Sequence, residues 1–600
     1  MKRTCLVGML ILACAMIGPV RAETSTNRVT GHLVQSNTPL ARKISNQVTR
    51  ERTLTLDKRY LLLPVRTRAK DEPKQIATVI VDGAPVRKFN IELDDQPGWF
   101  AHLDVSEWKG KSATLSVEKI PETSKALDLV STSAEVWNAA GLYHEPLRPQ
   151  LQFSARVGWM NDPNGLVFYN GEYHLFFQHS PYCWNGGGPH WGHATSRDLV
   201  HWEEQGEALY PDGLGGPWSG SAVVDWKNTS GFGKDGKPPL VLFYTYVGNP
   251  AVQCIAYSMD GRTFTKFAGN PVVKNISHYN RDPKVFWHEP TQRWVMVLYV
   301  GLPNADKPQT SGLMPNHTLH FFTSPNLREW TLASVTKGGG GEDFFLYECP
   351  DFFELPVDGD ASKKKWVLSA GNSEYTIGTF DGVKFTPEEV RLAGQSRRGC
   401  FYAPQTFNDT PDGRRIQIGW GQAPSPGMPF NQLQTFPCEL TLRSTSAGLR
   451  LRWQAVKELE CLRVKSWDYG KHNLSEGDTN PLADVRGELL EVRADFTPSA
   501  DSEVVFNVRG VEIRYNAAKQ EIFAADLRAP APLRDGHQRI TIFADRTYFT
   551  VFAGDGLTYM PFPVIPKPGN LGVEVEVKGG AIAVHQLEVF KLKSCWSRGQ

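Results

Sequence analysis

The stretch Ser196-Arg-Asp-Leu-Val-His-Trp202 decides the fold of this chain, because it returns three more times. The copies start 55 to 66 residues apart, and each combines a turn containing Asp or Asn with an aromatic residue that opens the next strand. Short apolar runs broken by Gly, Pro, Asn and Asp surround them, and helical periodicity is scarce. The sequence therefore predicts an all-β protein. The copies are Ser258-Met-Asp-Gly-Arg-Thr-Phe264, Ser324-Pro-Asn-Leu-Arg-Glu-Trp330 and the weaker Thr379-Phe-Asp-Gly-Val-Lys-Phe385.

A distinctive opening segment stands in each of five successive units. Five units of about four strands at this spacing predict a five-bladed β-propeller. A sandwich with coincidental turns is the alternative, but the motif returns at the same place in each unit. The first strand of every propeller blade lines the central channel, so the openings are expected to converge on one axial pocket. The openings are Asn161-Asp-Pro, Ser219-Gly-Ser, Arg281-Asp-Pro, Glu348-Cys-Pro and Ala403-Pro-Gln.

The segments that flank the repeats predict three further parts. Residues 1–22 are typical of a signal peptide, because Lys2 and Arg3 precede an apolar run that ends in small residues. We therefore expect a secreted or periplasmic protein without membrane insertion. Strand signals predict a small N-terminal β domain over residues 23–145, whose role is unassigned and is either sugar binding or packing against the propeller. The propeller is expected to be the catalytic domain over 147–455, and a C-terminal β-sandwich is expected over 456–600.

Composition narrows the classes of partner. The net charge of +1 gives no reason to expect nucleic acid. Aromatic residues make up 11% of the chain, including 17 Trp, which suits either a large β-rich core or stacking against sugar rings. Nine cysteines are scattered without a CxxC pair, so neither a zinc site nor a disulfide-dense scaffold is indicated.

Three carboxylates stand in the openings of units one, three and four: Asp162, Asp282 and Glu348. Each alone is typical of an ordinary turn, but the repeat directs all three toward one axis. Three acids in one pocket suit glycoside hydrolysis, because one must be ionised to attack the sugar carbon and another must protonate the leaving oxygen. We expect Arg281 to keep the neighbouring Asp282 ionised, as a stabiliser rather than an acid. Aromatic residues close by in sequence offer stacking surfaces: Trp159, Trp184, Trp191, Trp218, Phe401 and Trp420.

The run Trp159-Met-Asn-Asp-Pro-Asn-Gly165 resembles the signature of glycoside hydrolase family 32, the invertases, inulinases and levanases. Other stretches are similar to family motifs in the same order, over about residues 147–595, and residues 23–145 lie outside the shared region. They are Phe176-Phe-Gln-His-Ser-Pro181, Trp191-Gly-His-Ala-Thr-Ser196, Trp218-Ser-Gly-Ser-Ala222, Arg281-Asp-Pro283, Glu348-Cys-Pro-Asp351 and the levanase-like stretch from Met428 to Leu442.

The resemblance implies a retaining double displacement that uses no metal and no organic cofactor. Asp162 is then the nucleophile, Glu348 the general acid/base, and Asp282 with Arg281 holds the hydroxyls of the fructose ring. The remaining substrate-binding residues implied by the resemblance are Asn161, Gln178, Trp218, Ser219 and Trp420.

One position departs from the family pattern. The family usually has a Trp eight positions after Gln178, where this chain has Gly186 within Asn185-Gly-Gly-Gly-Pro. The spacing from Gln178 to Trp191 is kept, so this is a substitution and not a deletion. Our hypothesis is that Trp184 reaches the pocket instead and binds substrate.

The expected reaction is hydrolysis of terminal fructosyl units from levan or inulin, with sucrose as a further substrate. A sucrose-specific invertase is the alternative enzyme. A non-catalytic fructan-binding propeller is the alternative from another class, but it predicts loss of an acid, and all three are present. The linkage preference, exo or endo attack, and hydrolysis or transfer stay open, as does the oligomeric state.

Overall fold

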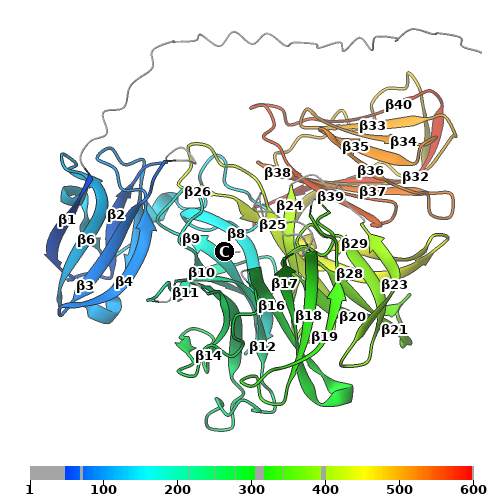
Figure 1. Cartoon of the computed structure of the whole chain (residues 1–600). Coiled ribbons are helices and arrows are strands. Elements are labelled where there is room, and N and C mark those ends of the chain that lie inside the picture. The colour runs from blue at the N-terminus through cyan, green and yellow to red at the C-terminus, as the bar shows by residue number, and fades with distance from the viewer. Residues whose placement is uncertain are drawn as a thin grey trace, which may run out of the picture. The chain divides into compact units, whose positions relative to one another are not determined.

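The computed structural model describes residues 47–67, 72–213, 215–248, 250–277, 279–303, 316–341, 343–393 and 400–597. The expected signal peptide, residues 1–22, lies outside the described residues. The described residues form strands joined by turns and short 3₁₀ helices, as predicted for an all-β chain, and they belong to one compact unit (Figure 1). None of the helices among them has the length and apolarity needed to cross a bilayer.

The N-terminal strands form two small sheets around one hydrophobic core. Side chains of β3 and β5 alternate between buried and half-buried, because successive residues of a strand point to opposite faces. The core between the sheets contains Leu63, Val79, Trp99 and Leu115, all nearly fully buried. One sheet has the order β1 (Gln47–Thr55), β6 (Ser112–Pro121), β3 (Gln75–Val81), β4 (Ala84–Ile91), and the other has β5 (Trp99–Asp104), β2 (Tyr60–Val65), β7 (Ser131–Ser133).

The five predicted propeller blades are present, each a four-stranded antiparallel sheet. The first three blades are β8 (Gly158–Tyr169), β9 (Glu172–Ser180), β10 (His190–Ser196), β11 (Glu203–Leu209); β12 (Gly216–Val224), β13 (Leu240–Val247), β14 (Val252–Ser258), β15 (Thr265–Lys266); and β16 (Tyr279–His288), β17 (Arg293–Leu302), β18 (Asn316–Ser324), β19 (Thr331–Lys337). The last two are β20 (Asp351–Val357), β21 (Asp360–Ser369), β22 (Tyr375–Phe380), β23 (Phe385–Leu392); and β24 (Phe401–Thr406), β25 (Arg415–Gly421), β28 (Cys438–Thr445), β29 (Gly448–Ala455).

The ring closes between the fifth blade and the first. The short strand β26 (Phe430–Asn431) pairs in parallel with β8, and β27 (Leu433–Gln434) pairs with β25. The amide of Gln434 donates to the carbonyl oxygen of Phe153 at 2.8 Å. The segment between β25 and β28 of the fifth blade therefore pairs with the first strand of the first blade.

Polar side chains tie the innermost strands to one another along the channel. Ser221 of β12 donates to the carbonyl oxygen of Pro283 in β16 at 2.7 Å, and Gln405 of β24 donates to that of Gly220 in β12 at 2.9 Å. Lys284 of β16 forms a 2.7 Å ion pair with Asp351 of β20, and both side chains are at most 1% exposed. These cross-links connect β12, β16, β20 and β24, and so they tie the strand that carries Asp282 to the strand that follows Glu348.

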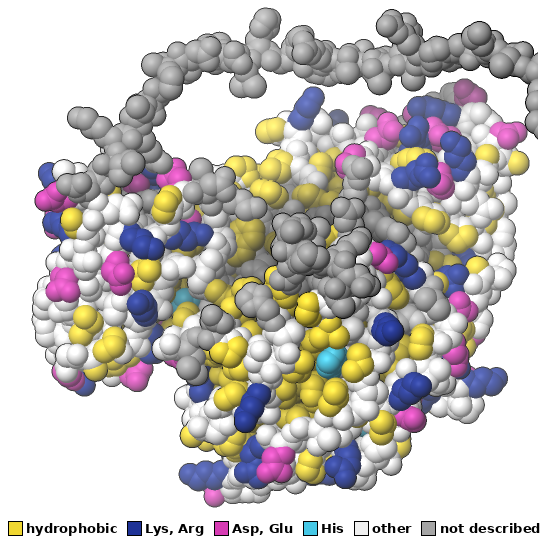
Figure 2. Space-filling model, in the orientation of Figure 1, with side chains coloured by type: hydrophobic (Ala, Val, Ile, Leu, Met, Phe, Trp, Pro, Cys, Tyr) yellow, Lys and Arg dark blue, Asp and Glu magenta, His cyan; other side chains and the backbone are white. Residues whose placement is uncertain are grey.

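A two-sheet sandwich follows the 3₁₀ helix η5 (Lys457–Leu462) and has a hydrophobic core of its own. Some side chains of one of its sheets join the propeller core instead, as Phe543 does where its ring meets that of Phe436. On the face shown in Figure 2, Lys and Arg side chains are interspersed with Asp and Glu, and the net charge of the chain is +1. One sheet contains β30 (Arg463–Asp468), β31 (His472–Ser475), β41 (Ala581–Leu592), β32 (Leu490–Pro498), β37 (Gln538–Ala544), β38 (Tyr548–Ala553) and β39 (Thr558–Pro563). The other has the order β36 (Leu527–Pro530), β35 (Glu521–Ala524), β34 (Val511–Asn516), β33 (Glu503–Val508), β40 (Val573–Lys578).

Candidate active site

Irregular backbone marks the inner strands where the motifs stand. A β-bulge leaves residues without a regular partner and redirects their side chains, which is why bulges accompany functional sites. The backbone is left-handed at Asp282 (φ 62°), and Glu348 and Cys349 just before β20 have φ of 40° and 45°. The register shifts lie between Met160 and Pro163 in β8, Trp218 and Gly220 in β12, Arg281 and Lys284 in β16, and Tyr402 and Gln405 in β24.

Asp162 is held at both carboxylate oxygens. Ser219 donates its hydroxyl to Oδ2 at 2.8 Å, and Asn161 donates Nδ2 to Oδ1 at 3.1 Å. The indole Nε1 of Trp159 donates to Oδ1 of Asn161 at 3.0 Å and fixes that amide in turn. Three of the predicted site residues, Asn161, Asp162 and Ser219, therefore form one hydrogen-bonded group.

Cys349 connects the first acid to the second. Its thiol sulfur lies 3.7 Å from Oδ2 of Asp162 and 3.5 Å from Oδ2 of Asp282, and its amide donates to the same Asp282 oxygen at 2.9 Å. Burial raises the pKa of this thiol well above its ordinary value, which keeps the proton on sulfur for donation. Asp162 and Asp282 thus share a neighbour although they are more than a hundred residues apart in sequence.

Glu348 is held by Arg281 and Tyr402. Arg281 donates Nε and Nη2 to Oε2 at 2.9 and 2.7 Å, while the Tyr402 hydroxyl donates to Oε1 at 2.6 Å. Arg281 also donates to the hydroxyl of Tyr347 at 3.0 Å. Both oxygens of the third acid are therefore oriented by neighbouring donors.

Arg281 lies closer to Glu348 than to Asp282, the acid that it was expected to keep ionised. The guanidinium makes its hydrogen bonds to Glu348, and its nearest approach to Asp282 is 3.7 Å. Burial raises the pKa of Asp282 above its ordinary 3.8, and the guanidinium offsets this only in part while Glu348 adds to it. Adjacency in sequence was misleading, because the bulge in β16 directs the two side chains differently.

The pKa of Asp162 is also raised, first by burial and then by the charge of Glu348, against the lowering effect of its hydrogen bonds to Asn161 and Ser219. Among the described residues, Arg281 is the cation that contacts this group of acids. Three carboxylates facing one guanidinium favour retention of a proton within the group, as acid/base catalysis requires.

Aromatic side chains stand beside the acids. Trp159 and Trp420 meet edge to face at 6.0 Å, and Trp420 meets Tyr402 in the same way at 6.3 Å. Trp420 donates Nε1 to Oε1 of Gln432 at 3.1 Å, which fixes its ring. Trp218 is 40% exposed and leaves a face available to a ligand. Trp159 and Trp420 thus agree with the predicted stacking surface.

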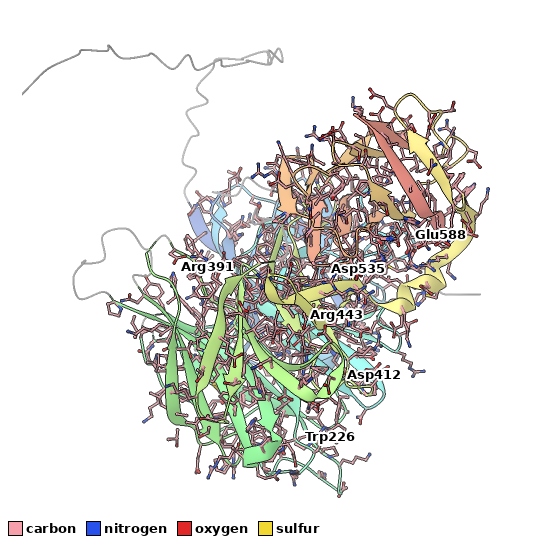
Figure 3. All side chains as sticks on the ribbon, turned by 90° about the vertical axis from the view of Figure 1, so that its right-hand side faces the viewer. Trp226, Arg391, Asp412, Arg443, Asp535 and Glu588 are labelled. Atoms are coloured by element: carbon pink, nitrogen blue, oxygen red, sulfur yellow. The ribbon has the colours of Figure 1, made fainter. Side chains whose placement is uncertain are left out.

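Some of the other aromatic residues near the motifs support the fold instead. Trp191 is fully buried and donates Nε1 to the carbonyl oxygen of Trp218 at 3.1 Å, and Phe401 packs in the propeller core. Gln178 is 4% exposed and donates Nε2 to the carbonyl oxygen of Pro217 at 3.2 Å. Trp226 is 61% exposed and is labelled in Figure 3. It comes shortly after the C-terminal end of β12, whereas Ser219 lies in the first half of that strand.

Trp184 does not take the place predicted for it. Its indole packs against the hydrophobic core of the N-terminal domain, and its amide donates to Oε2 of Glu92 in that domain at 2.8 Å. Gly186 lies against Trp159 instead, so close that a Cβ there would stand 2.9 Å from the indole nitrogen. The N-terminal domain thus determines the path of the segment between β9 and β10, and the sequence does not specify this contact.

Sequence reasoning also missed the roles of Tyr402 and Cys349. Cys349 stands inside the fourth opening, and Tyr402 directly precedes the fifth. The rule that openings converge on the axis applies to them as it does to the acids. Their chemistry was overlooked because Tyr and buried Cys are common core residues.

The fold and the acids together define a class: a glycoside hydrolase on a five-bladed propeller with a C-terminal sandwich. Residues 152–452 match the model of the "Glycosyl hydrolases family 32 N-terminal domain". The chain is 38% identical to a levanase of Bacillus subtilis (76% of this chain, 72% of the relative) and 33% identical to an extracellular exo-inulinase of Aspergillus niger (76% and 96%). The crystal structure of exo-inulinase from Aspergillus awamori superimposes with a TM-score of 0.67 at 31% identity, over 76% of this chain and 100% of that one. The protein belongs to glycosyl hydrolase family 32.

Proposed function

We propose that this enzyme is a retaining β-fructofuranosidase that hydrolyses terminal fructosyl units from fructans, with Asp162 as nucleophile and Glu348 as general acid/base. The observation that carries the proposal is the group around Cys349, in which the half-buried Asp162 and the buried Asp282 share one thiol neighbour. The third acid, Glu348, is held by Arg281 and Tyr402. The relatives named levanase and exo-inulinase support fructan as the substrate class.

In the first step, an oxygen of Asp162 attacks the anomeric carbon of the fructosyl unit. The bond from that carbon to the leaving oxygen breaks, and Glu348 gives its proton to this oxygen. In the second step, Glu348 takes a proton from water, the water oxygen attacks the same carbon, and Asp162 is released. Two displacements at one carbon return the product to the original configuration.

The side chains around the acids have supporting roles. Ser219 and Asn161 hold both oxygens of Asp162 in place for attack. Tyr402 and Arg281 orient Glu348. In this proposal Asp282 accepts hydrogen bonds from hydroxyls of the fructose ring and Arg281 donates to them, and these interactions strengthen as charge develops on the sugar. Trp159, Trp218 and Trp420 offer faces for the ring, and Gln178 completes the proposed binding set.

Product analysis on levan, inulin and sucrose tests the proposal. We expect the wild-type enzyme to release fructose from a fructan, Glu348→Ala to lose this activity, and the surface control Trp226→Ala to keep it. Fructose alone indicates exo attack, while a ladder of oligomers indicates endo attack. Release from sucrose but not from either fructan would favour a sucrose-specific invertase, and binding without release by the wild-type enzyme would favour a non-catalytic fructan-binding protein.

We also propose that the protein acts outside the cytoplasm. The relatives named extracellular exo-inulinase and the signal-peptide pattern of residues 1–22 support this. N-terminal sequencing of the mature protein is expected to begin near Glu23, and a mature chain that retains residues 1–22 would contradict export through a cleaved signal.

A further inference from the structure

The N-terminal domain lies outside the region that matches the family model, which begins at residue 152. We infer that this domain helps to form the fructosyl-binding pocket. It holds the segment 181–188 against Trp159, and Glu92 is the positioning residue. The inference rests on the proposed function, since it assigns the domain a role in binding the fructosyl substrate.

The segment 181–188 is anchored on the N-terminal domain by its side chains. Tyr182 is 2% exposed within the core of that domain, with its ring 4.0 Å from that of Phe89. Trp184 packs against the same core. The segment belongs to the loop between β9 and β10 of the first blade, so a propeller loop completes the core of another domain.

Backbone contacts fix the same segment. The amide of Glu92 donates to the carbonyl oxygen of Tyr182 at 3.2 Å, and the carboxylate of Glu92 accepts from the amide of Trp184 at 2.8 Å. Glu92 is 1% exposed, so its hydrogen bonds are shielded from water. The amine of Lys74 donates to the carbonyl oxygen of Gly186. A buried carboxylate on a backbone amide specifies a position, which apolar packing alone does not.

The glycines let the segment fit between the domain and the pocket. A Cβ at Gly186 would lie 2.9 Å from Nε1 of Trp159. On the other side, a Cβ at Gly188 would lie 3.2 Å from the side chain of Asn90, and the φ of Gly188 is +76°. Side chains at these positions would force the N-terminal domain and Trp159 apart.

Trp159 passes this positioning to the nucleophile. Its Nε1 donates to Asn161, and Asn161 donates to Asp162. Its ring also meets that of Trp420. The chain of contacts therefore runs from Glu92 through the segment 181–188 to Trp159, and from there to the acid that attacks the sugar. The domain thus supports the pocket wall formed by Trp159, where Gly186 lies against the indole.

The test compares Glu92→Ala with Glu92→Gln, which keeps an acceptor oxygen for the Trp184 amide. In Glu92→Ala we expect faster hydrogen exchange over residues 181–188 and a KM raised about tenfold, the loss that corresponds to one strong hydrogen bond. The kcat is expected to stay within about threefold, because the wall contributes to ground-state and transition-state binding alike. Glu92→Gln is expected to restore most of the wild-type KM.

Two further variants separate positioning from folding. Lys74→Met removes the contact to the Gly186 carbonyl from a half-buried position and is expected to raise KM in the same direction, so the inference stays testable if Glu92→Ala does not fold. Lys111→Ala removes an exposed ion pair with Asp82 in the same domain and is expected to change nothing. The inference would be overturned if Glu92→Ala and Lys74→Met both kept the hydrogen exchange and the KM of the wild type. An equal rise of KM in Lys111→Ala would also overturn it.

A wild-type enzyme inactive on levan, inulin and sucrose would contradict the proposed function instead. The inference is then decided by the exchange of residues 181–188 together with calorimetric affinity for free fructose. In Glu92→Ala we expect faster exchange and a lower affinity for fructose, and in Lys111→Ala neither change. Unchanged exchange and affinity in Glu92→Ala would overturn the inference.

Discussion

At the scale of single residues, the site depends on hydrogen bonds that oppose the effect of burial. Asp162 must be ionised to attack, yet burial raises its pKa. The hydroxyl of Ser219 and the amide of Asn161 lower that pKa again by stabilising the carboxylate. The reactivity of the nucleophile is therefore adjusted by neighbours contributed by two different blades.

Removing the Ser219 hydroxyl is expected to shift the pH profile. In Ser219→Ala the pKa of Asp162 rises further, and because attack requires the ionised form above that pKa, the acid limb of kcat/KM moves to higher pH by about one unit. The profile of kcat/KM against pH measures this. An acid limb that stays in place or moves to lower pH would contradict the role of Ser219.

Asp282 is expected to reduce stability at neutral pH. Its folded-state pKa is raised above the ordinary 3.8, so the folded protein binds this proton more tightly than the unfolded chain. The associated stability is present below the ordinary pKa and is lost as pH rises through the raised value. Asp282→Asn is therefore expected to be more stable than wild type at neutral pH by more than about 1 kcal/mol, while losing activity. Denaturant midpoints at acid and neutral pH test this, and a variant less stable at neutral pH would refute it.

At the scale of elements, bulges and glycines decide where side chains point. The sequence motifs located the inner strands, but the register shifts in β8, β12, β16 and β24 determine which groups meet. The Arg281–Glu348 pair is one result. In a regular strand, residues adjacent in sequence point to opposite faces of the sheet, and this alternation does not determine which residue of another blade Arg281 meets.

Gly186→Ala is expected to disturb the pocket. A Cβ 2.9 Å from Nε1 of Trp159 forces that indole or the segment itself to move, and the hydrogen bond to Asn161 lengthens. We expect kcat/KM to fall about tenfold, because misplacement of supporting groups is costly in catalysis. Gly98→Ala is the matched control, since a Cβ there has nothing within 4 Å. Equal activity of the two variants would show that the contact at Gly186 has no catalytic consequence.

At the scale of the whole molecule, the propeller holds acids from blades one, three and four together through its channel. Lys284 pairs with Asp351 and also donates to the carbonyl oxygen of Thr406 at 2.9 Å, which links blades three, four and five. Contacts of this kind make the position of each acid depend on the closed ring.

Breaking the buried pair is expected to destabilise the ring. Lys284→Met leaves the charge of Asp351 buried without its cation, at a cost of about 3–5 kcal/mol, and the double variant with Asp351→Asn is expected to recover part of it. Lys364→Met removes an exposed pair with Glu354 and should cost less than about 1 kcal/mol. Denaturant unfolding measures the stability of all three variants. Similar losses of stability in Lys284→Met and Lys364→Met would show that the buried pair contributes no more than an exposed one.

The sequence was sufficient for the propeller and for the grouping of Asp162, Asp282 and Glu348, because repeated motifs at regular spacing imply repeated positions. It was not sufficient for the partner of Arg281, the place of Trp184 or the role of Tyr402. Those depend on the path of loops and bulges, which local pattern does not encode. The contact between Glu92 and Trp184 joins two domains and has no sequence signature at all.

The central claim is that Asp162 forms the covalent bond to fructose, and trapping that intermediate tests it most directly. Glu348→Gln slows the second step by removing the base, while a fructoside with a good leaving group needs little acid assistance in the first. Mass spectrometry of this variant after mixing is predicted to find one fructosyl group on the peptide that contains Asp162. No covalent adduct, or an adduct on Asp282, would contradict the account.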